Sequence, residues 1–254
     1  MEVWLVRHGE TFANIQKIIQ GQQGGELTDN GIEQAKLVAQ RLSSEQFNHI
    51  YCKFETDARL REKGGGILEG QPLVTFKKEA QKAKKNLREY KPVKGESWSD
   101  VMRRAQSFIS EILSKHCNST AAEEQKSTDI TIKSKSKLSK SMINQEEEKK
   151  SSDFLQIKKI SGGQIPSGKL LPSSTSLVSN KILVITHGGF IMEFLNAVRV
   201  MQSKSPIFNN NAKNTAIYVI KFKQELKKTS KGTILKVIPQ VIVENDNRHL
   251  KGKD

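Results

Sequence analysis

Two short apolar runs, far apart in the chain, are typical of buried β-strands. The first covers residues 3–6 and the second covers residues 181–186. Continuous apolar runs of this length favour strands that are covered on both faces. Each run leads into a histidine that is followed by a glycine, at His8 and at His187. The pattern therefore predicts two core strands whose carboxyl ends carry similar polar residues.

Apolar positions at helical spacing predict helices after the first strand. One helix begins after Thr28, a favourable N-cap residue, with its apolar face at Ile32, Ala35, Ala39 and Leu42. A strongly basic helix is predicted over residues 74–90. A third helix opens at Ser97, which forms a capping-box pattern with Asp100. Its apolar face is Val101, Ala105, Phe108 and Ile112.

Further strands and helices complete an alternating pattern. Residues 48–51 are a short strand candidate, a helix is expected from residue 190 to about residue 201, and residues 214–222 and 233–243 read as two closing strands. Strands that alternate with helices predict a mainly parallel sheet between helices. We therefore expect an α/β fold, a three-layer α/β/α sandwich.

The pattern disappears between residues 117 and 180, where Lys, Ser and Glu dominate. Such a segment buries too little apolar surface to become ordered, so we predict a low-complexity, largely disordered insertion. It interrupts a single domain that spans residues 1–254. The polar tail, residues 245–254, is expected to be frayed.

Composition narrows the partners of this chain. The 254 residues are 35% hydrophobic, and 42 Lys and Arg against 27 Asp and Glu give a net charge of +15. The surplus favours anionic partners, such as nucleic acid, acidic membrane or phosphorylated metabolites. Aromatic residues make up only 6%, without the basic-aromatic pattern of nucleic-acid binding, so no specific nucleic acid is expected. Lysines of the basic helix either form a solvated surface or line an anionic substrate.

The location of the protein is predicted from three features. Two cysteines, Cys52 and Cys117, form neither a disulfide framework nor a metal-binding spacing. No secretory signal is visible, and no apolar run is long enough to span a bilayer. We therefore expect a cytoplasmic protein without a membrane span, and its oligomeric state is left open.

The residues around the first strand end are suited to phosphate chemistry. Arg7 supplies a planar donor fork, His8 supplies a nucleophilic nitrogen, and Gly9 lets the backbone approach a ligand. By itself this tripeptide is equally consistent with a strand that ends in polar loop residues. Because ligands of parallel sheets lie beyond the carboxyl ends of strands about 4.8 Å apart, His187 could reach the same phosphoryl group. The two strand-end histidines together favour a site.

The motifs resemble those of a known family. Leu5-Val6-Arg7-His8-Gly9-Glu10-Thr11 with Asn14, Leu27-Thr28-Asp29-Asn30-Gly31, and Thr186-His187-Gly188-Gly189 resemble the histidine phosphatase superfamily, which has the phosphoglycerate mutase-like fold. Gln20-Gly21, Leu60-Arg61-Glu62-Lys63 before Glu69-Gly70, the basic helix before Gly95-Glu96-Ser97, and Asn214-Thr215 look most like the fructose-2,6-bisphosphatase branch, which includes the p53-induced glycolysis and apoptosis regulator.

This resemblance implies an activity and a set of residue roles. His8 would be the nucleophile that carries a phosphohistidine, and Glu62 the proton donor. His187 would be the third catalytic residue, and phosphate would be bound by Arg7, Asn14, Gln20, Gly21 and Gly188. No cofactor and no metal is implied. The expected function is that of a metal-independent phosphatase of a small phosphorylated metabolite, and the expected substrate is a sugar bisphosphate such as fructose-2,6-bisphosphate.

One departure from the family pattern concerns the stretch after residue 53. A strand-helix segment that carries a second phosphate-binding arginine is missing there, and Lys53, Arg59 and Arg61 do not match its position. Glycines at residues 64–66 replace a Tyr-Gly pair and are expected to add flexibility. The deletion is real, a splice form or an error in the coding sequence. The alternative function is a catalytically impaired relative that binds phosphorylated ligands or protein partners.

Overall fold

The computed structural model describes residues 1–52, 57–117, 180–208, 212–229 and 232–251. The chain divides into two units. The first comprises Met1–Cys117, Val178–Lys223 and Ile238–Asp254, and the second comprises Asn118–Leu177 and Gln224–Val237. All predicted site residues lie in the first unit. Apart from its two end residues, the predicted insertion at 117–180 lies outside the described residues. The single domain over 1–254 stays a prediction.

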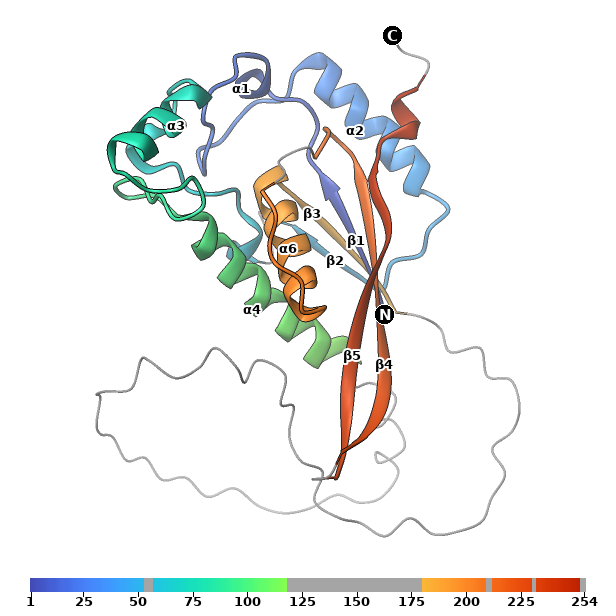
Figure 1. The fold of residues 1–254 in the computed structure, drawn as a ribbon. Helices are drawn as coiled ribbons and strands as arrows, with labels where there is room; N and C mark the ends of the chain where they lie inside the picture. Colours follow the sequence, from blue (N-terminus) through green and yellow to red (C-terminus); the bar gives the residue numbers. More distant parts are fainter. Residues whose placement is uncertain (53–56, 118–179, 209–211, 230–231, 252–254) are drawn as a thin grey trace, which may run out of the picture. The chain divides into compact units, whose positions relative to one another are not determined.

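The chain forms a five-stranded sheet in the order β2-β3-β1-β4-β5 (Figure 1), and its strands belong to the first unit except for residues 224–237 of β4, β5 and their connection. Its strands are β1 (Glu2–Arg7), β2 (His49–Cys52), β3 (Lys181–Thr186), β4 (Ile217–Thr229) and β5 (Gly232–Asp246). Strand β3 pairs in parallel with both β1 and β2, whereas β4 pairs antiparallel with β1. The parallel pairs confirm the predicted α/β class, and β4 makes the sheet mixed.

Helices cover both faces of this sheet. They are α1 (Phe12–Ile15), α2 (Asp29–Leu42), α3 (Leu73–Lys82), α4 (Trp98–Cys117) and α6 (Gly188–Met201), with short 3-10 helices η1 (Ala58–Leu60), η2 (Gly66–Leu68) and η3 (Arg248–Leu250). Helices α4 and α6 pack side by side on one face (Figure 1). Val38 and Leu42 of α2 pack on the other, against Val6, Leu183 and Ile217. None of the described helices is long and apolar enough to cross a membrane.

Helix α2 begins as predicted but buries a different face. The Oγ1 of Thr28 accepts the N–H of Gly31 at 2.9 Å, which confirms the N-cap. The predicted face is wrong for two of its four residues, since Ile32 is 44% exposed and Ala39 is also exposed, whereas Leu42 packs on the sheet. A Cβ on Gly31 would lie 2.0 Å from the carbonyl oxygen of Glu10. This close approach turns the side with Gly31 and Val38 inward.

The other two predicted helices agree with the structure to different extents. Helix α4 has the predicted capping box, in which the N–H of Asp100 donates a hydrogen bond to Oγ of Ser97 at 3.1 Å. Its predicted apolar face is fully buried. The basic helix is shorter than predicted. It ends at Lys82, and Lys84 adopts a left-handed φ of 51°.

The expectation of a frayed tail is wrong for residues 245–251. Strand β5 continues to Asp246, whose carboxylate forms an ion pair with Arg41 of α2 at 2.5 Å. In η3, Nε2 of His249 lies 3.0 Å from Oγ1 of Thr215. The tail is therefore attached to α2 and to the loop that precedes β4.

Candidate active site

The register of the sheet brings the two histidines together. In the parallel pair, Arg7 of β1 is the partner of Thr186 of β3, so His8 and His187 each follow a paired strand end. Their ring centroids are 5.0 Å apart, with the planes inclined at 60°. The N–H of His8 donates to the carbonyl of Thr186 at 3.0 Å. The predicted meeting of both rings at one edge of the sheet is thus present.

A backbone contact selects the tautomer of His8. Its Nδ1 lies 2.7 Å from the carbonyl oxygen of Gly9. A carbonyl oxygen only accepts hydrogen bonds, so Nδ1 carries the proton and Nε2 keeps its lone pair. Gly9 also approaches α2 closely, since a Cβ there would lie 2.3 Å from the carbonyl oxygen of Gly31. With Nδ1 protonated, the ring presents Nε2 as the nitrogen that carries the lone pair.

Arg7 extends the same edge with a buried cation. Its Nη1 donates to the carbonyl of Ala212 at 2.5 Å, whereas its Nε is buried without a hydrogen-bond partner. Gly188 lies beside this nitrogen, because a Cβ on Gly188 would be 3.3 Å from Nε. Burial lowers the pKa of Arg7, and the nearby carboxylate of Glu62 opposes that shift. A buried donor without a partner is costly, and an anion placed here would satisfy it.

Glu62 reaches the first turn of α6 from the loop that follows η1. Its Oε2 accepts the N–H of Gly189 at 3.0 Å, and its Oε1 accepts the N–H of Lys63 at 2.7 Å. Gly189 belongs to the first turn of α6, directly after His187. The carboxylate therefore lies at the positive end of this helix dipole, next to the histidine pair.

Asn14 lies close to His8, whereas the two other loop residues have different neighbours. Oδ1 of Asn14 accepts Nδ2 of Asn214 at 3.1 Å, and the same Nδ2 lies 3.5 Å from the carbonyl of His8. Sequence reasoning gave Asn214 no such role, although its position before β4 was noted.

Gln20 and Gly21 are held further along the loop. Oε1 of Gln20 accepts Oγ1 of Thr11 at 3.1 Å. Gly21 has a φ of 60° and lies against Glu69, since a Cβ would be 1.9 Å from the Glu69 carboxylate. Both residues contact loop groups, and their phosphate-binding role stays a prediction.

Lys63 is a site residue that sequence reasoning did not assign. It is only 7% exposed, and its Nζ lies 4.2 Å from the ring centroid of Phe76 and 5.4 Å from that of Trp98. Burial lowers the pKa of Lys63 to about 8, while Glu96 and Glu62 oppose the shift. Its place directly after Glu62 was the only signal in the sequence.

The two described arginines near the deletion are engaged elsewhere. Arg59 forms ion pairs with Asp57 at 2.5 Å and with Glu111 at 2.6 Å. Arg61 is exposed and donates to the carbonyl of Ala58 at 2.8 Å. Lys53 lies outside the described residues. Neither arginine is thus placed as a substitute for the missing phosphate clamp.

The glycines that follow Glu62 are packed, which corrects the expectation of flexibility. The N–H of Gly64 donates to Glu96 at 2.8 Å, and the N–H of Gly65 donates to Glu69 at 2.9 Å. Gly66 has a φ of 56°, and a Cβ there would lie 2.1 Å from the carbonyl oxygen of Val93. Glycine is required here for a close approach of backbones.

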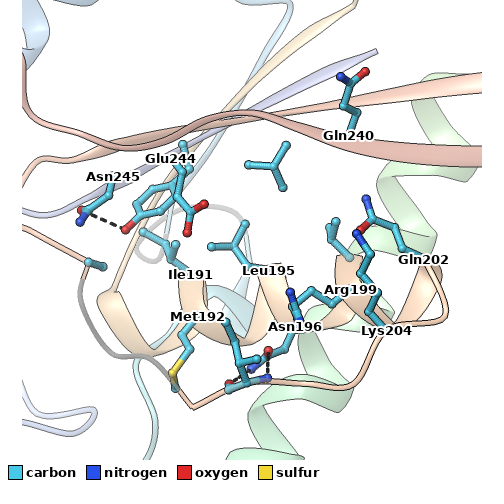
Figure 2. A pocket seen from close by; sticks show the side chains of 15 residues that line it. Ile191, Met192, Leu195, Asn196, Arg199, Gln202, Lys204, Gln240, Glu244 and Asn245 are labelled. Carbon is cyan, nitrogen blue, oxygen red and sulfur yellow. Dashed lines mark hydrogen bonds between the residues drawn. The ribbon is translucent and has the colours of Figure 1, made fainter.

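A cavity of about 400 Å³ lies between α6 and the strands β4 and β5 (Figure 2). Arg199 and Glu244 are among its lining residues, and Tyr218 in its wall donates to Asn245 at 3.1 Å. None of the predicted site residues lines this cavity. The strand-end histidines, with the adjacent guanidinium of Arg7 and carboxylate of Glu62, are the candidate active site. In the part of the chain that the structure describes, no three His, Cys, Asp or Glu side chains form a metal-binding group.

Comparison with known proteins agrees with this geometry. Residues 3–53 and 52–122 match the model of the histidine phosphatase superfamily (branch 1). The matched residues are similar to that superfamily and make up less than half of the chain. The two matched segments meet at residues 52–53, where the motifs predict a missing strand and helix.

Curated relatives are phosphoglycerate mutase-like. The probable phosphoglycerate mutases GpmB of Yersinia pestis and of Proteus mirabilis are each 32% identical over 136 residues. These alignments cover 44% of this chain and 63% of the relatives' length. The chain therefore matches less than two thirds of these proteins.

Solved structures share the fold. Mycobacterial glucosyl-3-phosphoglycerate phosphatase in complex with VO3 has a TM-score of 0.58 at 17% identity, covering 96% of this chain and 98% of that chain. Phosphoglycerate mutase from Bacillus anthracis has a TM-score of 0.58 at 16% identity, covering 100% and 97%. At these identities the likeness concerns the fold alone.

Proposed function

We propose that the protein is a metal-independent phosphatase that acts on a small phosphorylated metabolite through a phosphohistidine at His8. The observation that carries the proposal is the ring of His8, whose Nε2 keeps its lone pair beside His187 and the buried cation of Arg7. A nucleophile, an anion-binding fork and a carboxyl group on one edge are the groups that phosphoryl transfer to a histidine needs.

In the first step, Nε2 of His8 attacks phosphorus and the bond from phosphorus to the ester oxygen breaks. The leaving alkoxide takes a proton from the carboxyl group of Glu62, since an unprotonated alkoxide is a poor leaving group. Arg7 and His187 stabilise the charge on the phosphoryl oxygens. The products are phosphohistidine and the alcohol.

In the second step, water attacks the phosphohistidine and the bond from phosphorus to Nε2 breaks. The carboxylate of Glu62 accepts a proton from that water, which restores the carboxyl group. Inorganic phosphate leaves, and His8 returns to its starting tautomer. The same residue therefore acts first as an acid and then as a base.

We propose a sugar bisphosphate such as fructose-2,6-bisphosphate as the first substrate to test. Lys63 supports this choice, because a buried ammonium group near Glu62 suits a second anionic group on the substrate. The curated relatives bear the name of a mutase, and two of the similar structures are phosphatases of glucosyl-3-phosphoglycerate and of phosphoserine. Those compounds belong in the same substrate panel.

The test combines phosphate release with trapping of the intermediate. Purified protein is incubated with each substrate, quenched in alkali and assayed for phosphohistidine. We expect turnover and a trapped intermediate in the wild type, and neither in His8→Ala. His49→Ala is the matched control, since His49 is an exposed residue of β2. Equal phosphate release by wild type and His8→Ala would refute the proposal.

A second candidate function is that of a non-catalytic relative which binds phosphorylated ligands. This candidate is supported by Arg59, which lies close to the break in the family match and forms ion pairs with Asp57 and Glu111. Arg59 is therefore not available to bind a phosphate in place of the missing arginine. This candidate predicts thermal stabilisation by phosphate or vanadate, with no phosphohistidine from any substrate of the panel. Trapped phosphohistidine would exclude it.

A further inference from the structure

The loop that carries Glu62 has no helix or strand of its own at this residue, yet its backbone is held by side chains from elsewhere. The carbonyl of Leu60 accepts the buried Oγ1 of Thr186 at 2.6 Å. The carbonyls of Arg59, Arg61 and Glu62 accept the guanidinium of Arg104. One arginine thus binds both sides of the peptide segment that presents the carboxyl group.

Arg104 is itself fixed in three ways. Its Nε and Nη2 each lie 3.1 Å from the Glu96 carboxylate, and its side chain is only 13% exposed. Its guanidinium carbon lies 5.7 Å from the ring centroid of Phe190, a fully buried residue of α6. A planar fork with an ion pair and an aromatic neighbour has little freedom to move.

The partner carboxylate holds the other side of the loop. Oε2 of Glu96 accepts the N–H of Gly64 at 2.8 Å and Nε2 of Gln22 at 3.1 Å. The same Nε2 lies 3.1 Å from the carbonyl of Glu62. The ion pair between Arg104 and Glu96 therefore links the backbone before Glu62, which is bound by Arg104, to the backbone after it, which is bound by Glu96.

From this network we propose that Arg104 is a positioning residue that sets the location of the Glu62 carboxyl group relative to the leaving-group oxygen. The inference rests on the proposed phosphatase function and extends it. The hydrogen bonds of Arg104 to the described residues go to backbone carbonyls of the Glu62 loop and to Glu96, so Arg104 acts through Glu62. A carboxyl group displaced by about 1 Å costs on the order of 10²-fold in rate. Where the family's strand and helix are missing, side-chain hydrogen bonds to the backbone thus hold the acid.

The leaving group provides a selective test. An alkyl ester such as 3-phosphoglycerate needs protonation of its leaving-group oxygen, because an alkoxide is a poor leaving group. The ester p-nitrophenyl phosphate releases a stabilised phenolate and needs no such proton. For Arg104→Gln we expect kcat on 3-phosphoglycerate to fall by about 10²-fold. KM should change little, and p-nitrophenyl phosphate should be hydrolysed at nearly the wild-type rate. Arg103→Gln is the control, since that side chain is 73% exposed and pairs with Asp100.

Each outcome has a defined meaning. Equal losses on both esters, in a variant with the wild-type unfolding temperature, overturn the positioning role while the phosphatase function stands. A wild type that hydrolyses the aryl ester but neither 3-phosphoglycerate nor any alkyl ester of the substrate panel overturns the role, because the Glu62 carboxyl group then assists no alkyl leaving group. A wild type that is inactive on the aryl ester, on 3-phosphoglycerate and on every substrate of the panel refutes the proposed function and this inference with it.

A second variant keeps the test decisive if Arg104→Gln does not fold. Gln22→Met removes one contact to the Glu62 carbonyl and one to Glu96, while the ion pair of Arg104 stays in place. We expect the same selectivity for the alkyl ester with a smaller loss of kcat. An equal loss on both esters in this variant overturns the positioning role.

Discussion

His8 and His187 follow the ends of paired strands, whereas Glu62 sits in a loop next to a break in the family pattern. The histidine side is determined by register, since the pairing of Arg7 with Thr186 places both rings at one edge. The Glu62 side is determined by side chains that bind backbone carbonyls. A parallel sheet tolerates little change in register, whereas a loop depends on each of its contacts. The two sides of the site should therefore respond differently to substitution.

The largest expected effect concerns the carboxyl group of Glu62. The amide of Glu62→Gln keeps the acceptor for the Gly189 N–H but neither donates nor accepts a proton as an acid or base. We expect kcat on 3-phosphoglycerate to fall by about 10²–10⁴-fold. Phosphohistidine should still form from p-nitrophenyl phosphate, because the His8 side is intact. Rapid-quench kinetics measures both, and unchanged turnover of the alkyl ester would contradict the assignment.

A smaller effect is expected where the two sides touch. A Cβ on Gly189 would lie 2.0 Å from Oε1 of Glu62 and 2.9 Å from Cζ3 of Trp98. Gly189→Ala should therefore displace the carboxyl group without disturbing the strands, and lower kcat on the alkyl ester by about 10²-fold. Gly24→Ala is the control, because a Cβ there meets nothing within 4 Å. Equal kinetics for both variants would show that the Glu62 side tolerates displacement.

The smallest effect concerns Lys63 and is visible in the pH dependence. Because its pKa in the folded protein is about 8, Lys63 loses its charge above that pH, and KM for a bisphosphate should rise between pH 7 and 9. Lys63→Met should raise KM at pH 7 by about tenfold. Lys63→Arg, which keeps its charge, should show no alkaline rise. A flat KM profile in the wild type would exclude Lys63 from substrate binding.

Stability gives a second measurement for Lys63. The folded pKa of about 8 lies below the ordinary value of 10.5, so between these pH values the unfolded chain binds more protons than the folded chain. The free energy of unfolding should therefore rise with pH in that window. Lys63→Met should abolish this rise and add on the order of 1–3 kcal/mol of stability at pH 7. Denaturant unfolding at pH 7 and 10 measures both values.

The predictions from the sequence were correct where the apolar face given by residue spacing is also the face that is buried in the fold. Helix α4 has its capping box and its buried face where spacing placed them, since it packs side by side with α6. Helix α2 has the predicted N-cap but another buried face, because Gly31 lies against the backbone of Glu10. Periodicity counts apolar side chains and does not register a close backbone contact.

The same distinction applies to the candidate site. Local signals identified His8 and His187, because each directly follows an apolar strand and precedes a glycine. The resemblance to a family, rather than any spacing, identified Glu62. Lys63 and Arg104 carried no such signal. The contacts of Arg104 with the loop join residues 42 to 45 positions apart in the sequence.

By itself, the sequence determined the strands, the helix starts at Thr28 and Ser97, and the two histidine-glycine ends, because these depend on short-range hydrophobicity and hydrogen bonding. The tertiary structure alone decided where the carboxyl group of Glu62 lies and which groups hold it. The tertiary structure also paired Arg59 with Asp57 and buried Lys63 beside two aromatic rings. A loop without periodicity takes its conformation from partners far away in the chain, and those partners meet only once the sheet and its helices have packed.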